Sequence, residues 1–164
     1  MKKLILLFII VSVLFTACGP TTNDAVRFND RIIAAQKGCI QGEKSFFTAC
    51  DGFNPDEIKL SYTSFSTKVD SSLKIIQEVK EEKEFSAFRE NALALVTAYK
   101  NLLPKEYNEY AKIYSLPNDQ YTSKDSIRCV EVAEKINSTL NPLVKSFIME
   151  QEMFAKTWNF LIAK

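Results

Sequence analysis

Apolar residues recur along the chain at the spacing of an amphipathic helix, in four separate stretches. Residues three and four positions apart share one face of a helix, so each stretch predicts a helix with one broad apolar face. The first stretch runs from about residue 24 to residue 50, and its central apolar positions are Ala25, Phe28, Ile32, Ala35, Cys39 and Phe46. The residues that widen this face are Val26, Ile33, Ile40 and Phe47.

The second stretch opens with Asn54 and Pro55, a typical N-cap followed by proline at the first helical position. Its apolar face consists of Ile58, Tyr62, Phe65, Val69, Leu73, Ile76 and then either Val79 or Lys80. The charged run KEEKE, residues 80–84, is expected to form the turn that follows.

The third stretch covers residues 84–103, with an apolar face of Phe85, Phe88, Ala92, Leu95, Tyr99 and Leu102. Pro104 should end or kink this helix, and a further amphipathic piece continues to Leu116. The last stretch starts near Ser123, runs towards Leu161 and contains Pro142, which predicts a bend. Its apolar face consists of Ile136, Leu140, Leu143, Phe147, Phe154, Trp158 and Leu161.

Four helices that are apolar on one face must bury those faces against one another. Glycine is needed at many sheet turns, and the 112 residues after Gly52 contain none, which disfavours strands. The connections are short, so the sequence predicts an all-α fold: an up-down-up-down four-helix bundle with long first and last helices.

The beginning of the chain has a different pattern, with Lys2 and Lys3 before an apolar run and then the small residues Thr16 and Ala17. This order is typical of an export signal, and the apolar run is shorter than the ~20 residues that span a bilayer. The sequence FTAC, which ends at Cys18, resembles the lipobox of bacterial lipoproteins. The resemblance implies that residues 1–17 are a signal peptide and that Cys18 becomes the acylated first residue. Residues 18–23 would then be a lipidated tether, and residues 24–164 the helical domain.

Two further stretches resemble an uncharacterised surface-lipoprotein family of spirochaetes and Bacteroidetes-type bacteria. One is FNDRII, residues 28–33, followed by Gln36; the other is Gln151 followed by FAKTWNF, residues 154–160. Trp158 departs from the smaller or polar residue of the family pattern. The resemblance implies an exported, lipid-anchored helical domain, and it supplies no catalytic residues.

Charge and composition exclude several classes of partner and of catalytic site. Without Lys2 and Lys3 the 21 basic residues fall to 19, against 20 acidic ones, so a nucleic-acid partner is not expected. The chain has no histidine, which excludes the Ser-His-Asp triad and histidine-dependent zinc sites. It also has no glycine-rich phosphate loop. The sequence therefore predicts a protein that is not an enzyme and needs neither cofactor nor metal.

Three groups of residues are candidates for a site. Asn29, Gln36 and Glu43 are spaced by seven and point into the apolar face of the first helix, as Gln151 does on the last. They predict a polar layer that fixes helix register, or a polar pocket inside the bundle. Tyr107, Tyr110 and Tyr114 lead a tyrosine-rich region that suggests an aromatic binding surface, the alternative being half-buried core residues.

The cysteines left after lipidation are Cys39, Cys50 and Cys129. Cys39 and Cys50 could form a disulfide only if the helix breaks near Gly42, because eleven helical residues span about 16 Å. Either could instead pair with Cys129 near one end of the bundle. The remaining alternative is three buried free thiols that act as small apolar residues.

Together these features predict a lipid-anchored protein of the bacterial cell envelope with a binding or structural role. The lipid would supply its membrane contact, and an envelope protein or a glycan is the expected partner. No acidic cluster follows Cys18, which favours the periplasmic face of the outer membrane over the cell surface. The alternative function is a small-ligand or glycan-binding lipoprotein that uses the bundle interior or the tyrosine-rich end.

Overall fold

The structure, a computed structural model, describes residues 19–80 and 82–162, and every element within them is helical. The α-helices are α2 (Thr22–Asp51), α3 (Pro55–Glu78), α4 (Ser86–Leu102), α5 (Asn108–Tyr114) and α6 (Ser123–Thr157). A short 3₁₀ helix, η1 (Lys83–Phe85), precedes α4, and a π-helical turn, η2 (Leu103–Tyr107), joins α4 to α5. The all-α prediction is confirmed. Residues 1–17 and Cys18 lie outside the described residues.

Helix α2 begins at Thr22, two residues before the expected start. The reason is a capping box that the sequence analysis did not identify. The Thr21 hydroxyl accepts from the Asp24 backbone N–H, and the Asp24 carboxylate accepts from the Thr21 N–H at 2.9 Å. Hydrogen bonds from the Thr21 side chain and backbone, with Arg27 adding a third, lower the pKa of Asp24 to about 2. The segment between Cys18 and the helix is therefore shorter than predicted.

Helix α3 begins at Pro55, as the sequence predicts. The Asn54 side chain accepts from the backbone N–H groups of Asp56 and Glu57 and so caps α3. Val79 is buried and Lys80 is exposed, which decides between the two alternatives for the end of the apolar face.

Pro104 lies in the π-helical turn that joins α4 to α5. Helix α4 ends at Leu102, one residue before the expected end, and the chain continues through the π-helical turn directly into α5. In this wider turn the backbone N–H of Asn108 donates to the Leu103 carbonyl. The Tyr62 hydroxyl donates to the same carbonyl at 2.8 Å, which ties the turn to α3.

Helix α6 begins at Ser123, as predicted, with Thr122 as its cap, and it remains helical on both sides of Pro142. It ends at Thr157, four residues before the expected end at Leu161. Asn159 adopts a left-handed backbone conformation with φ of 53°, and the Phe160 N–H donates back to the Ala155 carbonyl at 3.0 Å. The prediction that Leu161 belongs to the apolar face of this helix is wrong, because the residue is 97% exposed.

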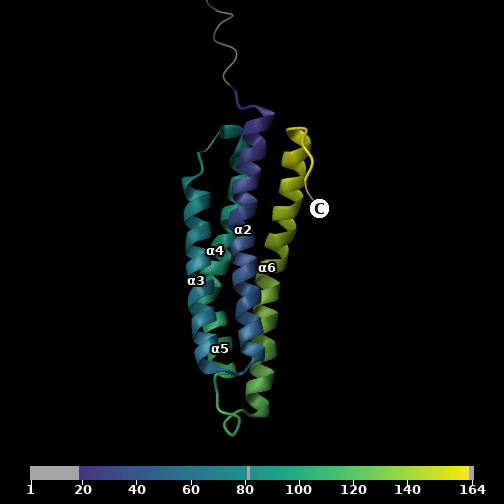
Figure 1. The fold of residues 1–164 in the computed structure, drawn as a ribbon. Coiled ribbons are helices and arrows are strands. Elements are labelled where there is room, and N and C mark those ends of the chain that lie inside the picture. The colour runs from purple at the N-terminus through teal and green to yellow at the C-terminus, as the bar shows by residue number, and fades with distance from the viewer. Residues whose placement is uncertain (1–18, 81, 163–164) are drawn as a thin grey trace, which may run out of the picture.

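The buried apolar positions form one continuous core along the helices. The central positions predicted for the first and third stretches are all buried, whereas Ile40, which was expected to widen the first face, is exposed. Helix α2 packs mainly against α3, α4 packs against α6, and α3 packs against α4. Figure 1 shows the start of α2 and the end of α6 at one end of the molecule, with α5 at the other.

Helices α2 and α3 lie close together at Gly42. A Cβ at this position would lie 2.7 Å from Cδ2 of the Phe65 ring and 3.3 Å from the Phe65 Cα. Phe65 is fully buried, so neither its ring nor its backbone has room to move away. The absence of a side chain at residue 42 is therefore what lets the two helices pack at this distance.

We expect Gly42→Ala to destabilise the protein, although the same exchange in an open helix stabilises by ~1 kcal/mol. Overpacking typically costs ~1–3 kcal/mol, so the free energy of unfolding should fall by about 1 kcal/mol net. Urea unfolding followed by circular dichroism measures this, with Gly19→Ala as control because nothing lies within 4 Å of its added Cβ. A Gly42→Ala variant more stable than the parent would contradict the close approach.

Candidate functional site

A carboxyl group lies among tyrosines in the second half of α2. Glu43 is half-buried, and its Oε2 accepts a hydrogen bond from the Tyr99 hydroxyl at 3.0 Å. Its Oε1 accepts a second hydrogen bond from the hydroxyl of Tyr107, whose side chain is completely buried. Glu43 thus ties α2 to both α4 and the π-helical turn.

The two tyrosines are held as neutral hydrogen-bond donors. Burial raises the pKa of both Tyr99 and Tyr107, and the negative charge of Glu43 raises it further. The sequence pattern places Glu43 in the seven-residue repeat, Tyr99 on the apolar face of the third helix and Tyr107 on a surface. The residue pattern does not reveal the π-helical turn, and in this turn Tyr107 points into the core.

A second polar contact lies closer to the start of α2. The Gln151 side-chain amide on α6 donates to Oδ1 of Asn29 at 3.0 Å, and Asn29 Nδ2 donates to the Asp30 carboxylate at 3.2 Å. The structure therefore brings together two of the four residues of the predicted polar layer, Asn29 and Gln151. Gln36 is half-buried, and the hydrogen bonds of the described residues do not connect it to this pair.

Ser72 is a buried polar residue that the sequence analysis missed. Its hydroxyl donates to the Ala35 carbonyl at 2.6 Å and so joins α3 to α2. Its place in the sequence indicates that it is buried, because it lies three residues after Val69 and four before Ile76, which are both buried. A small polar side chain on an apolar face can satisfy its hydroxyl by bonding to a neighbouring backbone carbonyl.

The predicted tyrosine surface requires a correction. Tyr107 is completely buried and does not contribute to any surface, because its ring fills the core against Phe46 and Phe65 at 5.7 and 5.0 Å. Tyr110 and Tyr114 are half-buried, and their rings stack at 4.7 Å with 21° between their planes.

Two phenylalanines extend the stacked tyrosine pair. Phe47 meets Tyr110 edge-on at 5.2 Å, and Phe53 lies 5.2 Å from Tyr114 with 52% of its surface exposed. Phe53 has a left-handed backbone with φ of 52°, in the turn that follows α2. We call Phe47, Phe53, Tyr110 and Tyr114 the α5 aromatic cluster.

Cys39, Cys50 and Cys129 are buried free thiols in this structure. Helix α2 is unbroken at Gly42, so the helix break that a Cys39–Cys50 disulfide requires is absent here. Burial, then the charge of Asp51, raises the pKa of Cys50 to about 12, which keeps its thiol protonated. The arrangement corresponds to the third alternative, in which the cysteines act as small apolar residues.

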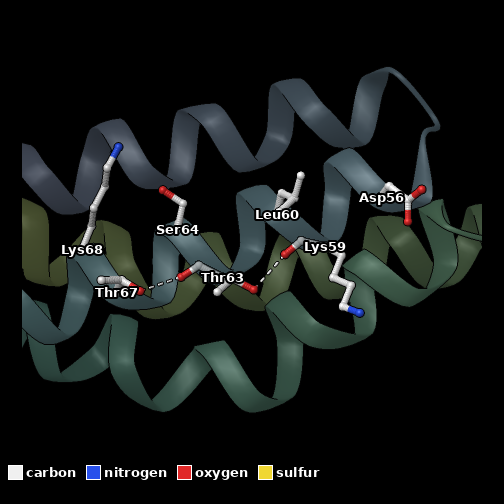
Figure 2. A pocket seen from close by; sticks show the side chains of 7 residues that line it. All are labelled: Asp56, Lys59, Leu60, Thr63, Ser64, Thr67 and Lys68. Atoms are coloured by element: carbon white, nitrogen blue, oxygen red, sulfur yellow. Dashed lines mark hydrogen bonds between the residues drawn. The ribbon is translucent and has the colours of Figure 1, made fainter.

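Figure 2 shows a shallow depression on the outer side of α3. Its lining residues all come from this one helix and are Asp56, Lys59, Leu60, Thr63, Ser64, Thr67 and Lys68. The hydroxyls of Thr63 and Thr67 donate to the carbonyls of Lys59 and Thr63 at 2.9 and 3.0 Å. These two hydroxyls are thus engaged by the helix itself, and the depression does not combine groups from different elements.

Within residues 19–80 and 82–162, no acidic or cysteine side chains cluster in a way that could hold a metal ion. In the same part of the chain no helix is both long and apolar enough to cross a membrane. The chain matches no known family model, no curated protein and no solved structure. The two sequence resemblances therefore stay predictions.

Removing the carboxyl group of Glu43 tests its role in the core. Glu43→Met leaves two buried hydroxyls without an acceptor at ~1–3 kcal/mol each, so the free energy of unfolding should fall by about 2–6 kcal/mol. Adding Tyr99→Phe and Tyr107→Phe removes the unsatisfied hydroxyls and should restore part of that loss.

Chemical denaturation of the single and triple variants measures this effect. Glu90→Met is the matched control, because Glu90 is exposed and its replacement removes no buried partner. A triple variant less stable than Glu43→Met alone would contradict the hydrogen-bonded arrangement.

Proposed function

We propose that this protein is an exported bacterial lipoprotein with a non-enzymatic binding or structural role in the cell envelope. In this proposal residues 1–17 are removed, Cys18 carries the lipid, and the helices form an up-down-up-down four-helix bundle. The pairing of α2 with α3, α3 with α4, and α4 with α6 supports that arrangement. The outer membrane, on its periplasmic face, is the location we favour.

One observation carries the proposal: the capped start of α2 lies immediately after the lipobox. Thr22 follows Cys18 by only four residues, which span at most about 14 Å at ~3.5 Å per residue. A lipid on Cys18 would hold this end of the helical domain close to the bilayer. Helix α2 has 30 residues and a length of about 45 Å at ~1.5 Å per residue.

This geometry assigns different roles to the two ends of the molecule. Phe53 follows the end of α2, so the α5 aromatic cluster lies about 45 Å from the anchored end. The hydrogen-bonded core between the ends supports a rigid spacer that presents the cluster to another component of the envelope.

The alternative function is binding of a glycan or another small ligand, and the α5 aromatic cluster favours the tyrosine-rich end over the interior. Stacked Tyr110 and Tyr114, with exposed Phe53 beside them, offer flat apolar faces with hydroxyls at their rims. Asn29 and Gln151 already satisfy each other in the interior, which leaves less for a ligand to bind there.

Replacement of Cys18 tests the lipoprotein proposal. A Cys18→Ser variant should lose fatty-acid labelling and leave the membrane fraction, because no thiol remains for acylation. Cys129→Ser is the control, since Cys129 is buried within α6 and should not affect labelling. Retention of both label and membrane association by Cys18→Ser would contradict the proposal.

The alternative function is tested by titrating the protein with oligosaccharide fragments of the cell envelope. Tyr110→Ala combined with Tyr114→Ala should weaken binding about tenfold or more, since aromatic contacts contribute ~0.5–1.5 kcal/mol each. Leu60→Ala, an exposed change on α3, should bind like the parent. Equal affinity of the double variant, with its helical circular dichroism retained, would exclude this end as the glycan site.

A further inference from the structure

The end of the molecule that carries the start of α2 also carries the end of α6 and the short helix η1 (Figure 1). Four aromatic rings pack together there. Phe85 lies 4.8 Å from Phe28, 5.3 Å from Phe154 and 5.2 Å from Trp158. We call Phe28, Phe85, Phe154 and Trp158 the α6-end cluster. Its phenylalanines are buried, whereas Trp158 is only half-buried.

Apolar side chains next to this cluster face outward. Leu161 is 97% exposed, and Met149 and Met153, one turn apart on α6, are both more than half exposed. The left-handed turn at Asn159 and the hydrogen bond from Phe160 to Ala155 hold this short segment against the end of α6. Leu161 is therefore kept outside the core by a hydrogen-bonded turn.

Charged side chains of both signs lie at this end, and two ion pairs are formed among them. Arg27 lies 2.6 Å from Asp24, and Lys80 lies 2.9 Å from Glu82. Such a surface has no excess of basic groups to attract anionic headgroups. Contact with a bilayer here would depend on apolar burial and on the amphipathic indole of Trp158, a side chain suited to the membrane–water interface.

We propose that Met153, Trp158 and Leu161 form a second membrane contact, seated in the interfacial region of the bilayer that holds the lipid on Cys18. The inference rests on the proposed function, because the short tether is what brings this end to the lipid. The occupant of the apolar surface is then a lipid bilayer, which lies within about 14 Å of the start of α2. The contact would limit tilting of the helices and keep the α5 aromatic cluster away from the membrane.

Trp158 is the only tryptophan of the chain and reports directly on this contact. The full chain is expressed with fatty-acid label, purified from membranes and reconstituted in phosphatidylcholine vesicles with or without brominated acyl chains. Bromine in the acyl chains should quench Trp158 emission. A Met153→Asp, Leu161→Asp double variant should lose this quenching but keep its label and sediment with the vesicles.

Leu60→Asp is the matched control, because Leu60 is an exposed leucine on α3 outside the α6-end cluster; it should be quenched like the parent. A labelled, sedimenting parent without quenching would overturn the second contact and leave the lipoprotein proposal intact. Unchanged quenching in the double variant would overturn the role of these residues. Absence of label and of sedimentation would overturn both proposals together.

Discussion

The hydrogen bonds that Tyr99 and Tyr107 donate to Glu43 are the contact on which the arrangement of the helices depends. Apolar packing alone tolerates small shifts of one helix along another, but two buried hydroxyls that share one carboxyl group do not. A shift of α2 against α4 would leave both tyrosines without an acceptor at a position where water does not reach them. The close approach at Gly42, one residue earlier on α2, fixes α3 against the same segment.

The molecule has one group of aromatic side chains around the start of α2 and another around α5, and the two ends differ. Around the start of α2 and the end of α6, phenylalanines are buried and apolar side chains such as Leu161 face outward. Around α5 the rings of Tyr110 and Tyr114 are half-buried and present hydroxyls. In our account the first end meets lipid and the second meets a partner, and the rigid core holds the two apart.

The sequence allowed the helices and most of the core to be predicted, because helical spacing of apolar residues depends only on which face is buried. It failed where the backbone leaves regular α-geometry. The π-helical turn at Pro104 points Tyr107 into the core, and the left-handed turn at Asn159 removes Leu161 from it; no glycine marks either place. Of the candidate polar layer, Asn29 and Gln151 do meet, but the contact between Glu43 and its tyrosines required knowledge of that turn.

Both proposed membrane contacts depend on where the mature chain begins and on the lipid that it carries there. Mass spectrometry of the protein purified from native membranes, with its amino-terminal peptide sequenced, tests this most directly. We expect a peptide that begins at Cys18 and is heavier than its sequence by the mass of fatty acyl chains. An amino terminus at any other residue, or an unmodified Cys18, would contradict it.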